Sequence, residues 1–165
     1  MLDFEFAAEE DEGLALAKPE ELLRQWGGIY SFAKNRTAEF YAQGNPAQLE
    51  SALAACCRKA KEQYAFTLFS GAVRVAPFAR YLKGAAYITA APSEIANRLG
   101  WKEVPSGSNF TLLVPYDDGV FFGARDINGE SVVSDVQLYL DLVSSKSRGE
   151  EAATFLLEQR LRSRW

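Results

Sequence analysis

Few residues of this 165-residue chain could carry out covalent chemistry, and histidine is not among them. Neither a Ser–His–Asp nor a Cys–His nucleophilic arrangement can therefore form within it. The two cysteines, Cys56 and Cys57, are adjacent, and neighbouring side chains on a helix point about 100° apart, so they cannot be joined without breaking the helix. A zinc site would need further ligands. We expect two small core residues in a reducing compartment.

Carboxylates offer a second kind of chemistry. Asp126 and Glu130 flank an Asn–Gly turn, as in nucleases of the D…E-x-K type, but Val132 stands where the lysine should be. A metal there would lack ligands and its water would lack a neighbouring cation. The adjacent acid pairs outside the N-terminus suit turns and the first turns of helices, where acids are structurally favoured; they are Glu20–Glu21, Asp117–Asp118 and Glu150–Glu151.

A degenerate nucleotidyltransferase is another reading, suggested by the segment "SGAVRVAPFARYLKGAAYI". Enzymes of that kind carry paired aspartates on the strand after a Gly turn, whereas Ala86, Tyr87 and Ile88 occupy that strand here. Neither a G-x-x-x-x-G-K-[ST] nor a G-x-G-x-x-G phosphate loop is present in the sequence. We predict no enzymatic activity, no metal and no cofactor, and at most an inactive relic of a nuclease or nucleotidyltransferase.

Basic residues gather near the C-terminus, where Arg160, Arg162 and Arg164 are joined by Lys146 and Arg148. Such charge could bind phosphate, but cations in a last helical turn also complement the helix dipole. Alternate positions on a helix do not share one face, which favours the structural interpretation.

The net charge of −4 is unevenly distributed along the chain: six of the 22 acids lie in residues 1–12 without a base, which leaves 18 bases against 16 acids in residues 13–165. That balance does not indicate a nucleic-acid binder.

The length and composition of the chain indicate one domain of residues 16–165, preceded by an acidic linker or tail of residues 1–15. No apolar run reaches the roughly 20 residues that span a bilayer, and the acidic start is unlike a secretory signal. We therefore expect a soluble cytoplasmic protein without membrane contact.

Capping signals place the helices. Asn45, Pro46 and Gln48 begin a helix over residues 46–62, and Ser134 with Gln137 begins one over residues 134–143. Ser147 and Glu150 repeat the pattern for a helix over residues 148–161. Further helices are expected from Pro19 to the Gly27–Gly28 pair and from Pro92 to Gly100.

Strands are predicted at "RTAEFYAQ", "YAFTLF" and "GAAYITA", followed by an antiparallel β-meander over Asn109–Val133. Asp118–Gly119 and Asn128–Gly129 are strong hairpin signals inside that meander. The prediction is an α+β fold with a mixed, mainly antiparallel sheet, a C-terminal β-meander and packing helices.

The helix predicted over residues 134–143 must pack against other elements on more than one face. Leu138, Leu140 and Leu142 cannot all face one core, because alternate helical residues lie about 200° apart. The simplest cover is the 148–161 helix folding back across the 144–147 turn. We expect an Arg148–Asp141 ion pair to fix that crossing, with Glu151 or Arg160 left on the outer face.

The same stretch carries a family resemblance. "VVSDVQLYLDL" followed by "SRGEEAATFLL" resembles the C-terminal signature of the AbiEi-type antitoxins, transcriptional regulators of bacterial type IV toxin–antitoxin systems. "PEELLRQWGGIYSFAKNR", "YAFTLFSGAVRVAPF" and "GSNFTLLVPYDDGVFFGARDINGE" occur upstream in the family's order, so the resemblance covers about Leu16 to Leu161. The signature positions are Gln137, Tyr139, Asp141, Gly149 and Glu150.

The resemblance implies a function. In that family the matching region follows an N-terminal winged-helix DNA-binding domain, which is absent here, and "LDFEFAAEEDEG" resembles the interdomain linker. The implied protein binds operator DNA through that winged helix, represses its own operon and opposes a nucleotidyltransferase-like toxin without a stable complex. The candidate contacts with a partner or nucleic acid are Arg148, Glu151, Arg160, Arg162 and Arg164. The alternative is a nucleic-acid-binding accessory domain.

Overall fold

The computed structural model describes residues 6–10, 13–77, 80–145 and 148–165. Its strands are β1 Ala7–Glu10, β2 Gly13–Leu16, β3 Arg36–Tyr41, β4 Tyr64–Phe66, β5 Gly84–Ile88, β6 Lys102–Glu103, β7 Phe110–Val114, β8 Arg125–Ile127 and β9 Glu130–Val132. Its α-helices are α1 Pro19–Ile29, α2 Pro46–Ala60, α3 Leu68–Val75, α4 Pro92–Leu99, α5 Asp135–Ser144 and α6 Arg148–Leu156. None of the helices in these residues is long and apolar enough to cross a membrane.

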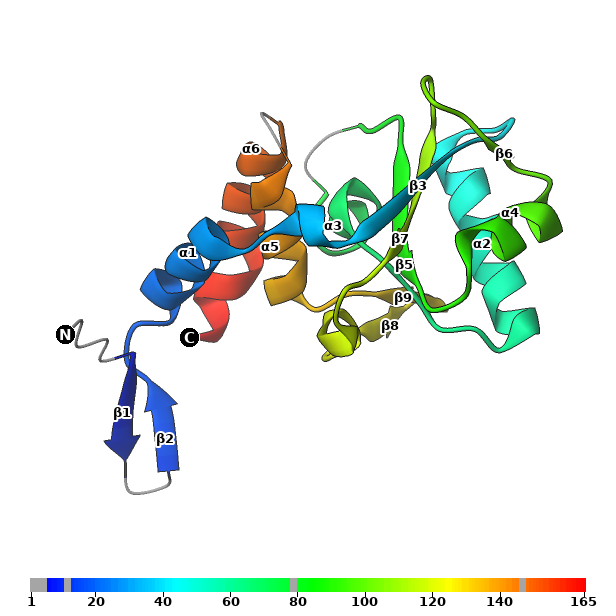
Figure 1. Cartoon of the computed structure of the whole chain (residues 1–165). Helices are drawn as coiled ribbons and strands as arrows, with labels where there is room; N and C mark the ends of the chain where they lie inside the picture. Colours follow the sequence, from blue (N-terminus) through cyan, green and yellow to red (C-terminus); the bar gives the residue numbers. More distant parts are fainter. Residues whose placement is uncertain (1–5, 11–12, 78–79, 146–147) are drawn as a thin grey trace.

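The main sheet of the described residues has the order β6-β3-β7-β5-β4-β9-β8 (Figure 1). Strand β7 pairs with β5 in parallel, and so does β9 with β4, whereas the other pairs of neighbours are antiparallel. The predicted α+β class with a mixed, mainly antiparallel sheet is confirmed. Within the segment expected to be an acidic linker, β1 and β2 pair as a small antiparallel sheet of their own.

The predicted continuous meander over Asn109–Val133 is wrong. Strand β7 lies in the middle of the sheet between β3 and β5, and β8–β9 lies at an edge. The Asn128–Gly129 turn does join β8 to β9, with positive φ at both residues, but Asp118–Gly119 begins a 3₁₀ turn over Asp118–Phe121. The reason can be seen in β7, whose residues are almost all buried, as in a strand covered on both faces.

Alternate residues of the central strands divide the core into two halves. Ala85 and Tyr87 of β5 face the half that contains α5 and α6, while Ala86 and Ile88 face the half under α2 and α4. Figure 1 shows α2 and α4 at one end of the molecule and α1, α5 and α6 at the other. The sheet therefore separates a layer formed by α2 and α4 from a cluster formed by α1, α3, α5 and α6.

Helix α5 is covered on several sides, as predicted: Leu138, Leu140 and Leu142 are all fully buried, and α5 packs against α1, α3 and α6. Gly149 makes the α5–α6 approach possible, because a Cβ there would lie 2.4 Å from the backbone oxygen of Leu142. The final helix continues beyond α6 as a π-helical turn over Leu157–Leu161.

Two local predictions are corrected. Helix α1 runs through Gly27–Gly28 to Ile29, because Gly27 packs against Tyr139 and Val143 of α5 and tertiary contact outweighs the glycine signal. The predicted cap at Ser147 and the charge at Lys146 lie outside the described residues.

Candidate functional site

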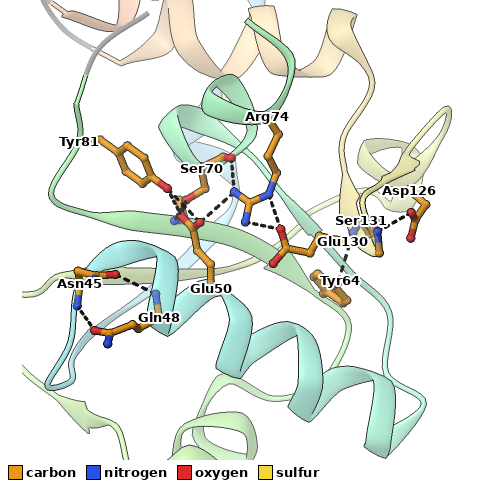
Figure 2. A network of polar contacts seen from close by, with 12 residues as sticks. Asn45, Gln48, Glu50, Tyr64, Ser70, Arg74, Tyr81, Asp126, Glu130 and Ser131 are labelled. Atoms are coloured by element: carbon orange, nitrogen blue, oxygen red, sulfur yellow. Dashed lines mark hydrogen bonds and ion pairs between the residues drawn. The ribbon is translucent and has the colours of Figure 1, made fainter. Parts of the chain in front are cut away.

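The first candidate site is a cluster around the buried carboxylate of Glu50, which we call the Glu50 cluster (Figure 2). It consists of Glu50 on α2, Ser70 and Arg74 on α3, Tyr81 in the loop before β5, and Glu130 on β9. Helix α2 is held at its start by the predicted capping box, in which the Asn45 side chain accepts from the Gln48 amide at 3.0 Å and the Gln48 side chain accepts from the Asn45 amide at 2.9 Å. Glu50 lies in the next turn.

The members of the Glu50 cluster point toward one another. Ser70 donates to Oε1 of Glu50 at 2.5 Å, Tyr81 donates to the same oxygen at 2.8 Å, and Nη1 of Arg74 donates to Oε2 at 2.9 Å. The other side of the Arg74 guanidinium donates to Oε2 of Glu130, at 2.8 Å from Nε and 2.6 Å from Nη2. The guanidinium also lies over the ring of Phe66, 4.3 Å from its centroid. Arg74 therefore joins α2, α3 and β9.

The charges in the cluster reinforce one another. Burial acts to lower the pKa of Arg74, but the carboxylates of Glu50 and Glu130 outweigh it and raise that pKa. Burial and the bond to Glu50 raise the pKa of Tyr81. Ser70 donates to Glu50 and accepts from the Ala85 amide at 2.9 Å, so its hydroxyl is committed to structural bonds. The cluster holds charge in place and offers no activated nucleophile.

An open cavity of about 880 Å³ adjoins the Glu50 cluster. Glu50, Arg74, Tyr81 and Glu130 of the cluster contribute polar groups to its lining. The remaining lining residues are Asn45, Pro46, Ala47, Val73, Pro77, Arg80 and Leu82.

Asp126 and Glu130, the two acids of the nuclease hypothesis, do not point to a common site. Asp126 accepts a hydrogen bond from the Gly129 amide at 2.8 Å and stabilises the β8–β9 turn, whereas Glu130 is paired with Arg74. No group of three or more Cys, Asp or Glu residues within the described ranges is placed to hold a metal ion. Ala86, Tyr87 and Ile88, which replace the aspartates of the nucleotidyltransferase reading, are fully buried in β5.

The signature residue Asp141 is the centre of a second buried cluster. Its Oδ1 accepts hydrogen bonds from the Tyr30 hydroxyl at 2.7 Å, from the Gln137 amide at 2.9 Å and from the Tyr87 hydroxyl at 3.0 Å. Thr67 donates to Oδ2 at 2.5 Å. Burial raises the pKa of Asp141 to about 6, although these hydrogen bonds act to lower it.

The predicted Arg148–Asp141 ion pair is wrong. Asp141 is fully buried, facing α1 and β5, while Arg148 donates to the backbone oxygen of Arg80 at 2.8 Å and lies over the ring of Phe69. Four neutral donors already satisfy Asp141. The predicted capping box at the start of α5 is half formed. The Ser134 hydroxyl accepts a hydrogen bond from the backbone N–H of Gln137 at 3.1 Å, but the Gln137 side-chain amide donates to Asp141 and Tyr30 instead of the Ser134 backbone.

The C-terminal arginines separate into two groups. Arg160 and Arg164 lie 3.7 and 3.3 Å from Oδ2 of Asp135, and Arg125 pairs with the other oxygen of that carboxylate. Arg162 points elsewhere, to Glu20 at 2.8 Å. The expectation that alternate arginines do not share a face is confirmed for Arg162.

Asp135 and Glu20 were not recognised from the sequence as partners of these arginines. Asp135, 4% exposed, is the first residue of α5, and Glu20 lies in the first turn of α1. An acid at the start of a helix is already explained by the helix dipole, so the sequence does not indicate that it also pairs with a distant arginine. Hydrogen bonds from Arg162 and Arg24 lower the pKa of Glu20 to about 2. Glu150 and Glu151 are exposed in the first turn of α6.

The identity of the chain follows from comparison with known families. Neither the curated proteins nor the solved structures include a significant match to it. A family described as "Transcriptional regulator, AbiEi antitoxin, Type IV TA system" matches residues 15–162, which include α1 to α6 and both buried carboxylate clusters. The chain belongs to the AbiEi antitoxin family of transcriptional regulators from type IV toxin–antitoxin systems.

Proposed function

We propose that this chain is a non-enzymatic antitoxin region of a cytoplasmic regulator, which opposes a nucleotidyltransferase-like toxin without forming a stable complex with it. The observation that carries the proposal is the family match over residues 15–162. The geometry agrees with a non-enzymatic role, because the acidic groups of the catalytic readings are engaged in a turn or an ion pair.

The turn between α5 and α6 and the outer face of α6 are our candidate surface for antitoxin action. Arg148 and Glu151 are exposed there, and Arg148 also holds the backbone of Arg80 at the rim of the cavity.

Co-expression with the cognate toxin tests the surface. We expect Arg148→Ala, Glu151→Ala and Arg160→Ala to reduce rescue of growth, while Glu103→Ala on the edge strand β6 retains it. Each variant must keep the wild-type melting temperature, because Arg148 and Arg160 also have contacts within the fold. If all three folded variants rescue growth fully, antitoxin action does not use this surface.

The absence of catalysis is tested separately. We expect no magnesium-dependent cleavage of DNA or RNA by the purified chain. Cleavage that is lost in Asp126→Ala or Glu130→Ala would show that the nuclease reading was the correct one.

Operator recognition belongs, in this proposal, to the winged helix that the family resemblance implies. We expect residues 1–165 alone to give no sequence-specific footprint on the operator, because specificity requires an element in the DNA groove. A retained footprint would assign that recognition to the helices and strands described above.

A second candidate function is nucleic-acid binding, and the Asp135 cluster favours it. Arg125, Arg160 and Arg164 surround one carboxylate, which leaves two positive charges in excess at this point. Phosphate contacts would make affinity for nonspecific duplex fall steeply with salt. A gel shift across a salt series, comparing wild type with Arg164→Gln, measures whether such contacts exist.

A further inference from the structure

The cavity beside the Glu50 cluster has the size and the composition of a ligand site. Its volume of about 880 Å³ lies in the usual range for small-molecule pockets, roughly 300–1,000 Å³. Its lining combines apolar groups, including Ala47, Val73 and Leu82, with the charged groups of the cluster. A ligand that fits it must therefore carry both an apolar part and a polar end.

The four charged residues of the lining, Glu50, Glu130, Arg74 and Arg80, balance, so the sign of the polar end depends on which of them it contacts, and the Glu50 cluster favours a cation. Glu50 and Glu130 share one cation, Arg74, so the cluster carries one negative charge in excess. Arg74 binds Oε2 of Glu130, and within the described part of the chain Oε1 accepts no hydrogen bond. The Glu130 side chain is 22% exposed, so this oxygen belongs to a carboxylate that solvent reaches.

Arg80 is the opposing charge in the lining. It is exposed, and its backbone is held by Arg148. Its guanidinium has no carboxylate partner among the ion pairs of the described residues. A cation in the cavity is therefore attracted by Glu130 and repelled by Arg80, which gives two substitutions with opposite expected effects.

We propose that this cavity binds an alkyl cation, that is, a guanidinium or ammonium group at the end of an aliphatic chain. The cationic end pairs with the carboxylate of Glu130, and the aliphatic chain lies along Ala47 and Val73. Charge-assisted hydrogen bonds are stronger than neutral ones, and apolar walls suit the methylene stems of such groups. The same chemistry is found in polyamines and in basic side chains of proteins. This site is independent of the proposed antitoxin function.

Calorimetric titration of the whole chain with two matched probes tests the charge requirement. Butylguanidinium is expected to bind at least about tenfold more tightly than butylurea, its neutral counterpart, because only the cation forms a charge-assisted bond. Spermidine and an acetylated Gly-Arg-Gly amide then distinguish a free polyamine from a peptide side chain as the source. Equal affinity for butylguanidinium and butylurea, or no binding of butylguanidinium at millimolar concentration, would overturn the proposal.

Substitutions locate the binding. We expect Glu130→Gln to weaken butylguanidinium binding about tenfold and Arg80→Gln to strengthen it several-fold, while Glu103→Gln, a matched charge change on β6, leaves it unchanged. Gln retains an oxygen that can accept from Arg74, and a melting curve checks the fold of each variant. Ala47→Trp adds a large side chain to the cavity lining from an exposed position and is expected to abolish binding. Wild-type affinity in folded Ala47→Trp would place the ligand elsewhere and refute this site.

Discussion

Glu50 and Asp141 are nearly equally inaccessible, at 1% and 0% exposure, yet their carboxylates have different kinds of partner. Glu50 is bound by a cation, Arg74, and by two hydroxyls. Asp141 is bound by three hydroxyls and one amide, all of them neutral.

The difference follows from position. Glu50 lies beside an open cavity, where Arg74, whose side chain is 12% exposed, can supply a charge without complete desolvation. Asp141 lies on the buried side of α5, facing β5 and the end of α1, where a second ion would itself have to be desolvated at a cost of several kcal/mol. Neutral donors avoid that cost, and the raised pKa of Asp141 is the consequence. Of these two clusters, the one at the cavity retains a charge that a ligand could reach.

Breaking the charged cluster is expected to have the largest effect. Arg74→Met leaves Glu50 buried without its cation and releases β9 from α3, so the free energy of unfolding should fall by about 3–5 kcal/mol. Urea unfolding followed by circular dichroism measures it. Arg98→Met on the exposed face of α4 is the matched control and should stay within about 0.5 kcal/mol of wild type. A small loss in Arg74→Met would mean that the Glu50 cluster contributes little to the fold.

The neutral cluster around Asp141 should make the free energy of unfolding depend on pH. The pKa of Asp141 is about 6 in the folded protein and 3.8 ordinarily, so the folded state binds the proton more tightly. The contribution of this group to stability is therefore largest below about pH 4, falls as pH rises to about 6, and is constant above that. Asp141→Asn has no such dependence. The free energy of unfolding of wild type minus that of Asp141→Asn should fall by about 1–3 kcal/mol between pH 4 and pH 7.

Urea titrations of both proteins at several pH values give that difference. Other carboxyls with shifted pKa values, such as Glu20 and Glu39, are present in both proteins and cancel. Parallel pH curves for the two proteins would show that Asp141 does not titrate as its surroundings indicate.

Local elements of this fold could be predicted from the sequence, because their signals are local. Asn45, Pro46 and Gln48 define the start of α2, and Gly100 ends α4 in the left-handed conformation. Strand order could not be predicted in the same way. The chain between β7 and β8 is predicted as a continued meander, yet the almost completely buried β7 pairs in parallel with β5. That pairing depends on contacts distant in sequence.

The candidate sites were predictable only in part. Arg160 and Arg164 were found by composition, but their partner Asp135 has an equally good local role at the start of α5. The Glu50 cluster was missed because a single glutamate in an amphipathic helix resembles an exposed residue. The partial signal was that Glu50 follows Leu49 and precedes Leu53 by three positions, on the buried side of α2.

A single donor to Asp141 gives a smaller test of the comparison. Tyr30→Phe removes one of three hydrogen bonds to Oδ1 and should reduce the free energy of unfolding by about 0.5–1.5 kcal/mol. The pKa of Asp141 should also rise, because that bond stabilises the charged form. Carboxyl NMR titration measures the pKa, and Tyr41→Phe at an exposed position serves as the control. An unchanged pKa would mean that the Tyr30 bond is not made in solution.

The smallest expected effect on stability lies at the exposed Glu20–Arg162 pair. Hydrogen bonds from Arg162, and secondly from Arg24, hold the pKa of Glu20 at about 2, below its ordinary 4.5. The stabilising contribution of this carboxylate is present above pH 4.5 and is lost as pH falls toward 2, but solvent screens an exposed pair and keeps it small. Arg162→Ala should leave the melting temperature at pH 7 nearly unchanged while raising the pKa of Glu20, and should raise it more than Arg24→Ala does. Carboxyl NMR titration of Glu20 in the three proteins measures this order.

If the pKa of Glu20 stays near 2 in Arg162→Ala, Arg162 does not pair with Glu20 in solution. Its charge would then be available beside Arg160 and Arg164, which would strengthen the case for phosphate binding at the C-terminus.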